Sequence, residues 1–480
     1  MGGGAARQAG DVGAPLVSRL SPARRAALRL LVAAAERDAY VRELIDRTPV
    51  ADALSARDRA FCRRLVLGVT ASEGALDAVL DRYLDRPAKV SLRVRTALRL
   101  SAFELLYLGT VPEAAVSQGV ELVRSQARGA AGLANAVLRR VAAGAEGFLA
   151  ADDAAEADRA LVSTARRAGL PLWLARAVAA AQGKDALSAL AAGQLEPAPL
   201  ALHALPGFEE QMGAADGPLP GCRLDFDVAA LIDAGAFECA RAVVTDAHAQ
   251  LIATGAVRPG TCLEIGAGRG TKTYVMACQA RRAGFARRVV ALDLYAHKAA
   301  QNRARLEHAG LDGITTVVGD GRDLDRALAP LDEGGRRLFD TVFVDAPCSG
   351  TGTMRRHPEI PWRLDPASVA AGGALPGLQL ALLTEAARRV ERGGELWYAT
   401  CSVLKSENDE VVARFLASPE GAGFCLEPPS RAAIFDEPLF FSAARHLAAY
   451  ENGDGLMQTV PVLGGFDGHF CARLVRRAAT

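Results

Sequence analysis

The chain has 480 residues, of which 50% are hydrophobic, with nine cysteines and a formal net charge of +1. This length exceeds one ordinary domain, so we expect two or three. The odd cysteine count, with no CxxC pair, argues against a disulfide framework or a metal site and indicates a reducing, cytoplasmic compartment. No apolar run is expected to reach the ~18 residues of a membrane span, so we predict no membrane partner. We also expect a monomeric protein.

The charge is distributed unevenly along the chain. Residues 1–150 contain 22 lysines and arginines against 15 acidic residues, a net +7, and the remaining residues carry −6. A basic front end on a mildly acidic body is typical of nucleic-acid binding by the front end. An arginine-rich genome would give the same excess, so charge alone does not decide between these interpretations.

The first half of the chain is predicted to be mostly helical. Residues 1–20 lack an apolar signal core and are expected to form a disordered tail. From 21 to 145, apolar residues recur at helical spacing, with breaks at Pro87 and Pro112, which predicts an all-α domain. Residues 141–160 have no clear apolar face and read as a linker, so 146–240 is interpreted as a linker followed by a small bridging α+β region.

From residue 241 onward, short β-branched runs alternate with helical segments. The predicted strands are 262–266, 289–294, 314–318, 340–344 and 395–400, and helices are expected at 297–308 and 378–390. This alternation predicts an α/β domain over 241–480 with a parallel, doubly wound sheet. Ligands of such sheets bind beyond the carboxyl ends of the strands.

A glycine-rich loop follows the first predicted strand, in the stretch LEIGAGRGTKT, residues 263–273. Gly266, Gly268 and Gly270 have the spacing GxGxG, whereas a dinucleotide fingerprint would need GxGxxG. Glycines let the backbone turn tightly and approach a ligand closely. The loop is typical of S-adenosylmethionine-dependent methyltransferases, although a plain strand-to-helix turn is the alternative. Asp293 and Asp320 end the next two strands, where carboxylates suit ribose hydroxyls and an adenine amino group.

Two cysteines follow the last two predicted strands. Asp345-Ala346-Pro347-Cys348 stands where amino-methylating enzymes place an Asn/Asp-Pro-Pro-aromatic motif, and Cys401 follows the neighbouring strand. A thiolate that adds to carbon 6 of a pyrimidine activates carbon 5 toward a methyl sulfonium. Most free cysteines are small buried hydrophobes, and we interpret the other seven in that way. The pair at the active edge predicts pyrimidine C5 methylation, with either thiol as the nucleophile.

Two long motifs resemble a known family. The stretches DAPCSGTGTMRRHPEIPWR (345–363) and YATCSVLKSENDE (398–410) resemble the paired signatures of the Sun/RsmB branch of RNA cytosine-C5 methyltransferases. The helical front end is similar to the NusB-like RNA-binding domain of bacterial members, and DGHFCARLVR resembles the family's final strand. The resemblance implies an all-α NusB-like domain followed by a class I, Rossmann-like methyltransferase domain.

The resemblance also implies residue roles and partners. Cys401 would attack carbon 6, Cys348 would assist proton removal or product release, and Asp345 would contact the cytosine and the methionine end of the cofactor. S-adenosylmethionine would be held by the loop and strand-end residues Gly266, Ala267, Gly268, Arg269, Gly270, Thr271, Lys272, Asp293, Asp320 and Asp345. The substrate would be small-subunit (16S) ribosomal RNA, contacted by Arg355, Arg356 and His357.

The sequence departs from the family pattern in two places. The cofactor loop reads GAGRGTKT where the family usually has APGGKT, and residues 200–205 lack the usual Arg-Val-Asn motif. Two alternatives therefore stay open: 5-methylcytosine formation in transfer RNA or another RNA, and a catalytically silent RNA-binding ribosome assembly factor. The intact cysteines argue against the silent factor, because RNA binding alone does not need two thiols there.

Overall fold

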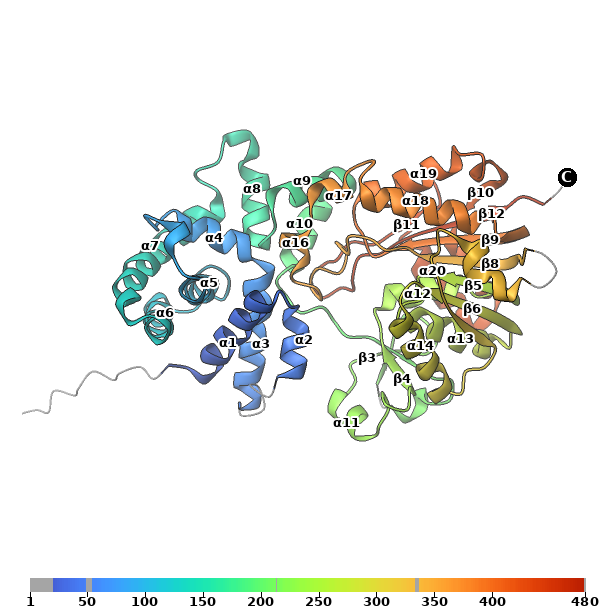
Figure 1. The fold of residues 1–480 in the computed structure, drawn as a ribbon, viewed down its shortest axis with the longest axis horizontal. Helices are drawn as coiled ribbons and strands as arrows, with labels where there is room; N and C mark the ends of the chain where they lie inside the picture. Colours follow the sequence, from blue (N-terminus) through green and yellow to red (C-terminus); the bar gives the residue numbers. More distant parts are fainter. Residues whose placement is uncertain (1–19, 49–53, 213, 333–335, 479–480) are drawn as a thin grey trace, which may run out of the picture. The chain divides into compact units, whose positions relative to one another are not determined.

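The computed structural model describes residues 20–48, 54–212, 214–332 and 336–478, and the chain divides into two compact units (Figure 1). The first unit ends at Asp153 and the second begins at Ala154. The predicted disordered tail, except for its last residue, lies outside the described residues.

The first unit is a helical bundle built around its fifth helix. Its helices are α1 (Pro22–Arg37), α2 (Val41–Arg47), α3 (Ala56–Ala71), α4 (Glu73–Asp81), α5 (Leu92–Tyr107), α6 (Pro112–Gln126) and α7 (Ala131–Ala150). Helix α5 contacts α1, α3, α4, α6 and α7, and most of its residues from Val94 to Leu106 are buried. Its one fully buried acid, Glu104, accepts two hydrogen bonds from Arg24 of α1, so the charge is paired inside the bundle.

The predicted linker at 141–160 is wrong over its first half, because α7 continues to Ala150. Val141 and Phe148 are buried there, and a Cβ on Gly144 would collide with the hydroxyl of Tyr83. The glycine therefore allows close helix packing, and the compact unit extends to Asp153 rather than 145.

The second unit opens with three helices that pack on its loops. They are α8 (Glu156–Ala168), α9 (Leu172–Gln182) and α10 (Lys184–Gly193). Their apolar faces share a core with Met354, Val369, Val403 and Leu404. The stretch that the sequence assigned to a bridge is thus part of the second unit.

A small antiparallel sheet follows these helices, in the order β2-β3-β1-β4. Its strands are β1 (Leu202–Ala204), β2 (Ala215–Asp216), β3 (Cys222–Leu224) and β4 (Ala242–Val244), and the short helix α11 (Val228–Asp233) precedes β4. Because β4 pairs with β1, this sheet runs past residue 240, the predicted end of the bridging region.

The main sheet has the order β10-β12-β9-β8-β5-β6-β7. Its strands are β5 (Gly260–Ile265), β6 (Arg287–Asp293), β7 (Ile314–Val318), β8 (Phe339–Asp345), β9 (Val390–Thr400), β10 (Phe424–Glu427) and β12 (Phe470–Arg476), with β11 (Met457–Gln458) beside β12. The five predicted strands pair in parallel, as expected. The remaining strands pair antiparallel, so the sheet is mixed, which the prediction of a parallel sheet did not include.

Helices cover both faces of this sheet (Figure 1). One face packs against α15 (Leu324–Leu328), α18 (Ala374–Ala387) and α19 (Asp409–Leu416). The other packs against α12 (Ala247–Gly255), α13 (Thr271–Ala283), α14 (Ala296–His308) and α20 (Phe441–Ala448). Burial on both faces explains the continuous apolar runs of the central strands.

One stretch, Pro366–Ala387, is apolar enough by length and composition to cross a membrane, which corrects the expectation that none is. It consists of α17 (Pro366–Val369) and α18, separated by Gly372 and Gly373. The 14 residues of α18 span about 21 Å, short of the ~30 Å hydrocarbon core. Leu382, Leu383 and Ala386 of α18 pack into the core on the sheet, so it is a core helix of this fold.

Candidate active site at the carboxyl edge of the sheet

The strand order reverses between β5 and β8, where ligands of doubly wound sheets bind. Ile265 pairs with Val344, and Asp345 pairs with Ala399, so the loops after β5, β8 and β9 begin side by side. A cavity of about 510 Å³ opens at this edge. Eight of the predicted site residues line it: Gly266, Gly268, Lys272, Asp293, Asp320, Asp345, Cys348 and Cys401.

The glycine loop takes a shape that only glycine allows. Gly266 has a φ of 81°, and a Cβ there would collide with the carbonyl oxygen of Asp345. Gly270 has a φ of 80°, and a Cβ there would collide with the side chain of Asn302. The loop is thus pressed against β8 and α14, and Gly268 lies on the cavity.

Four predicted cofactor residues, Ala267, Arg269, Gly270 and Thr271, are not among the residues that line this cavity. Ala267 is buried, and Arg269 is exposed. Arg305 of α14 donates to the carbonyl of Arg269 and to the hydroxyl of Thr271. Arg269 and Thr271 therefore anchor the loop to α14 rather than facing the cavity.

The two strand-end acids differ in how they are engaged. Asp293 is buried and accepts from the backbone N–H groups of Gly268 and Tyr295, which orients its carboxylate at the cavity wall. Asp320 is paired with Arg322 through both carboxylate oxygens, and this pairing lowers the pKa of Asp320. Asp293 is therefore the better-positioned acceptor, while Asp320 reaches the cavity as half of an ion pair.

The cavity also has an apolar wall that the sequence reading missed. Leu294 and Tyr295 follow Asp293 and are 55% and 51% exposed, and Leu378 and Leu382 of α18 line the same cavity. Lys298 lies 4.6 Å from the centre of the Tyr295 ring. Large apolar residues directly after an acidic strand end are the signal that could have revealed this wall.

The two cysteines lie in contact on the lining of the cavity. The Sγ atoms of Cys348 and Cys401 are 3.2 Å apart, and the N–H of Cys401 points at the sulfur of Cys348 at 3.3 Å. Both side chains are half-buried. The sequence placed both thiols at this edge, and the structure brings them into contact.

The two thiols have different environments. The hydrogen bond from Cys348 lowers the pKa of Cys401, and the positive charge of Lys272 acts in the same direction. The pKa of Cys348 is raised, first by its hydrogen bond to Cys401 and then by burial. The pair therefore favours a thiolate on Cys401 and a proton on Cys348.

Lys272 is the cation beside this pair. Its ammonium lies 2.6 Å from Oδ2 of Asp345, and this ion pair outweighs the effect of burial and raises the pKa of Lys272. Below it, Glu264 is fully buried, which raises its pKa to about 7, and its Oε2 accepts from the hydroxyl of Thr273 at 2.6 Å. The site thus holds a fixed positive charge and a carboxyl poised near neutrality.

A second buried carboxylate joins the two cysteine loops. Oε1 of Glu407 accepts from the N–H of Ser349 at 2.8 Å and from Gln379 at 3.0 Å. Its Oε2 accepts from the hydroxyls of Ser349 and Ser402 at 2.5 and 2.6 Å. Because these serines directly follow Cys348 and Cys401, Glu407 fixes the spacing of the thiols. The SENDE stretch was noted in the sequence, but this role was not predicted.

The predicted RNA-contact residues lie away from the cavity, and Arg355 is buried. Its guanidinium donates to the carbonyls of Val462, Gly465 and Phe466, and its side chain is 1% exposed. The prediction that Arg355 contacts RNA is wrong for this fold, because its side chain is buried and both of its terminal nitrogens hold the loop before β12.

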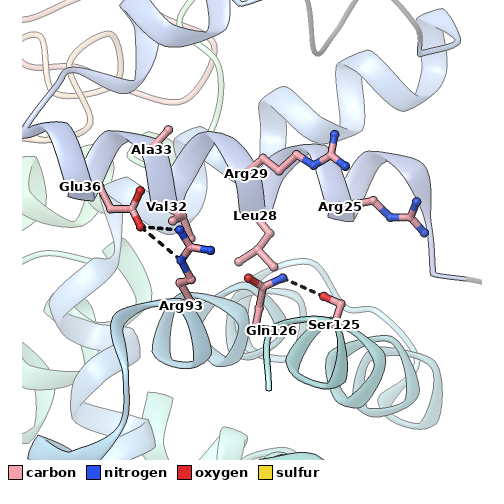
Figure 2. A pocket seen from close by; sticks show the side chains of 9 residues that line it. All are labelled: Arg25, Leu28, Arg29, Val32, Ala33, Glu36, Arg93, Ser125 and Gln126. Carbon is pink, nitrogen blue, oxygen red and sulfur yellow. Dashed lines mark hydrogen bonds and ion pairs between the residues drawn. The ribbon is translucent and has the colours of Figure 1, made fainter. Parts of the chain in front are cut away.

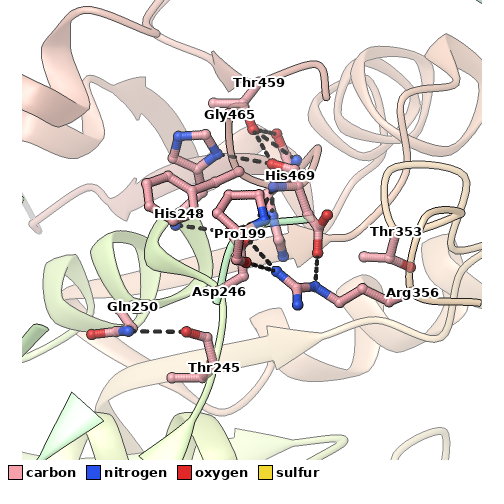
Figure 3. Close-up of polar contacts among 12 residues, drawn as sticks. Pro199, Thr245, Asp246, His248, Gln250, Thr353, Arg356, Thr459, Gly465 and His469 are labelled. Carbon is pink, nitrogen blue, oxygen red and sulfur yellow. Dashed lines mark hydrogen bonds and ion pairs between the residues drawn. The ribbon is translucent and has the colours of Figure 1, made fainter. Parts of the chain in front are cut away.

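Arg356 is also tied to its own chain (Figure 3). It pairs with Asp467 and Asp246 and donates to the carbonyl of Pro199. Its side chain is 18% exposed, so little of it can reach a phosphate. His357 is exposed and stays a candidate for RNA contact.

Asp246, His248 and His469 bring potential metal-ligand atoms within 4.8 Å of one another (Figure 3). The carboxylate of Asp246 already accepts from the backbone of His248 and of Asp467, and it pairs with Arg356. A metal ion would have to displace that guanidinium. The cluster instead connects the start of α12 to the segment before β12.

The helical unit has a groove of its own (Figure 2). It encloses about 370 Å³ and is lined from α1 by Arg25, Leu28, Arg29, Val32, Ala33 and Glu36, with Arg93, Ser125 and Gln126 opposite. Arg25 and Arg29 are exposed one helical turn apart, whereas Arg93 pairs with Glu36. The groove therefore has two adjacent exposed guanidinium groups on one wall.

Comparison with known proteins agrees with this architecture. The family described as 16S rRNA methyltransferase RsmB/F matches residues 256–474, and the NusB family matches residues 21–143. Ribosomal RNA small subunit methyltransferase B of Thermus thermophilus is 33% identical over 441 residues, which cover 90% of this chain and 92% of that protein. The protein of the same name from Pseudomonas putida is 30% identical and covers 89% and 93%.

Two solved structures share the fold. The crystal structure of PH0851 aligns with a TM-score of 0.67 at 20% identity and covers 94% of this chain and 98% of that one. A methyltransferase homolog from Pyrococcus horikoshii gives 0.50 at 17% identity and covers 66% and 99%. The resemblance and the fold class expected from the sequence are confirmed, and the chain belongs to the RsmB/F family of 16S rRNA methyltransferases, with a NusB-family domain preceding its methyltransferase domain.

Proposed function

We propose that this protein transfers the methyl group of S-adenosylmethionine to carbon 5 of a cytosine in small-subunit (16S) ribosomal RNA, with Cys401 as the nucleophile. The observation that carries the proposal is the pair of contacting thiols, 3.2 Å apart, that line a cavity at the switch point of the sheet. Membership of a 16S rRNA methyltransferase family supports the substrate class. We further propose that it acts as a monomer in the cytoplasm.

The lining of the cavity suits S-adenosylmethionine. The carboxylate of Asp293 would accept from the ribose hydroxyls, and Leu294, Tyr295 and Leu382 would pack on the adenine. Asp345, beside Lys272, would face the charged methionine end. When bound, the group supplies an electrophilic methyl.

The residues of the chain would divide the remaining chemistry. The Cys401 thiolate adds to carbon 6 of the cytosine, which makes carbon 5 nucleophilic. Lys272 stabilises that thiolate, and the Asp345 carboxylate would hold the cytosine by accepting a hydrogen bond from its exocyclic amino group. After carbon 5 is methylated, a base removes its proton and the Cys401–carbon 6 bond breaks, which releases the thiolate. Cys348, whose sulfur contacts that of Cys401, would assist the proton removal or this release.

We propose that the helical unit supplies part of the RNA affinity. Arg25 and Arg29 stand on one face of α1 beside the groove (Figure 2), and His357 is exposed in the methyltransferase domain. Guanidinium groups at such a surface would bind phosphates without reading sequence.

The test is methyl transfer from labelled S-adenosylmethionine to ribosomal RNA lacking the modification, with the products identified as nucleosides by mass. Wild type should form 5-methylcytosine, Cys401→Ala should form none, and Cys348→Ala should accumulate a covalent protein–RNA adduct. The exposed Cys239→Ala is the matched control and should behave as wild type.

Each other outcome contradicts a specific part of the proposal. Activity in Cys401→Ala would show that the nucleophile is wrong. If wild type binds S-adenosylmethionine but leaves ribosomal RNA unmodified, the substrate is transfer RNA or another RNA. If it binds RNA but no S-adenosylmethionine, the protein is a silent assembly factor.

A further inference from the structure

The contact between Cys348 and Cys401 has a chemical consequence beyond methyl transfer. A disulfide needs an S–S distance of about 2.05 Å, so the two sulfurs at 3.2 Å would have to approach by only about 1.2 Å. Their loops are held in register by hydrogen bonds from Ala346 to Ala399 and from Gly352 to Cys401. The pair is thus preorganised for a cross-link.

The pair also has the features of an oxidisable site. Both thiols are half-buried and line an open cavity, so a small oxidant can reach them. Cys401 favours the thiolate and Cys348 stays protonated beside it, which is the arrangement of an attacking thiol with a resolving partner. By contrast, Cys62, Cys222, Cys262, Cys278 and Cys471 are buried.

We propose that Cys348 and Cys401 form a site of reversible oxidation, at which a hydroperoxide such as hydrogen peroxide converts the two thiols into an intramolecular disulfide. The Cys401 thiolate attacks one peroxide oxygen, the O–O bond breaks, and hydroxide leaves, giving a sulfenic acid. The Cys348 sulfur then attacks the Cys401 sulfur, the S–O bond breaks, and the departing hydroxide takes the Cys348 proton as water. In sum, two thiols and one peroxide give one disulfide and two waters.

The cross-link would inactivate the nucleophile. A disulfide at Cys401 has no thiolate to add to a pyrimidine, so oxidation should stop methyl transfer until a dithiol reduces the bond. This loss of activity rests on the proposed function, whereas formation of the bond does not. The neighbouring thiol also protects Cys401 from irreversible oxidation, because disulfide closure competes with a second attack by peroxide.

The test is disulfide mapping of the full-length protein. Reduced protein is treated with hydrogen peroxide, remaining thiols are alkylated, and the digest is analysed by mass spectrometry. We expect two thiols to be lost, one cross-linked peptide pair joining Cys348 to Cys401, and recovery of both thiols with dithiothreitol. Cys239→Ala should give the same result, because the exposed Cys239 is outside the pair.

The Cys348→Ala variant and a methyl-transfer assay extend this test. In Cys348→Ala, Cys401 should go on to sulfinic acid that dithiothreitol does not reverse. If peroxide leaves both Cys348 and Cys401 open to alkylation, or links Cys401 to a different cysteine, the oxidation proposal is overturned. If the cross-link forms in a protein that shows no methyl transfer before treatment, the proposed function fails while the oxidation proposal stands.

Discussion

Glu407 offers a sharp test of how the site is built. Replacing it by alanine removes four hydrogen bonds to a buried carboxylate and leaves the N–H of Ser349 without its acceptor. Bonds to a charged group contribute about 1.5–3 kcal/mol each, and removing the buried charge recovers several kcal/mol. We therefore expect a net loss of about 3 kcal/mol or more of unfolding free energy. In Glu407→Gln, one oxygen remains and the two serine hydroxyls can turn to accept, so the loss should be about 1–2 kcal/mol.

Urea unfolding followed by tryptophan fluorescence measures this loss. All three tryptophans, Trp173, Trp362 and Trp397, belong to the second unit, so the signal reports on that unit alone. The matched control is Glu391→Gln, at an exposed glutamate of β9, which should unfold as wild type does.

A second readout separates charge from structure. The negative charge of Glu407 raises the pKa of Cys401, so Glu407→Gln should move the alkylation profile of Cys401 to lower pH. Loosened loops would separate Cys401 from the hydrogen bond of Cys348 and move the profile to higher pH. If neither the unfolding curve nor the alkylation profile changes, the role assigned to Glu407 is refuted.

Four further substitutions have defined outcomes. Lys272→Met removes the cation beside Cys401, so alkylation of Cys401 should shift to higher pH, and methyl transfer should fall by at least about tenfold at neutral pH. Burial raises the pKa of Glu264 to about 7, so ionisation of this carboxyl lowers the unfolding free energy of the wild type as pH rises from the unfolded-state pKa toward 7. Because the amide of Glu264→Gln does not ionise, this variant should gain about 2–3 kcal/mol of unfolding free energy relative to wild type between pH 5 and pH 8 in the same assay. Arg355→Met should lower unfolding free energy by about 3–5 kcal/mol but leave the salt dependence of RNA binding unchanged, whereas Arg29→Gln should reduce that slope by about 1 in filter binding.

Much of the methyltransferase domain could be predicted because its strands are buried on both faces. The predicted strand at 314–318 agrees in both bounds, and the other four overlap the observed strands. β9 begins five residues early, at Val390, because its first residues include exposed charges and two glycines, which do not read as a strand. The antiparallel pairing of β12 depends on a partner some 70 residues earlier in the chain, which periodicity cannot reveal.

The wrong predictions of a linker and of RNA-contacting arginines have physical explanations. The segment around Gly144 has the composition of a linker, but Gly144 lies in α7 and packs against Tyr83. Arg355 and Arg356 follow an active-site loop and carry the charge expected of an RNA contact. Their partners lie more than 100 residues away in the chain, around Asp467 and, for Arg356, also at Asp246 and Pro199. Nothing local therefore indicates that these guanidinium groups are already paired.

The division of labour between the two thiols is a property of position rather than residue type. Both cysteines lie in loops that follow adjacent parallel strands, and both are followed by a serine that binds Glu407, so their local sequences are similar. They differ in their surroundings. The hydrogen bond from Cys348 lowers the pKa of Cys401, and Lys272, on the helix that follows the glycine loop, acts in the same direction, whereas the hydrogen bond to Cys401 and burial raise the pKa of Cys348. The hydrogen bond between the sulfurs then leaves the proton on Cys348. In the proposed reaction, Lys272 would thus reinforce the choice of Cys401 as the attacking cysteine, and its ion pair with Asp345 would join the cofactor site to the nucleophile.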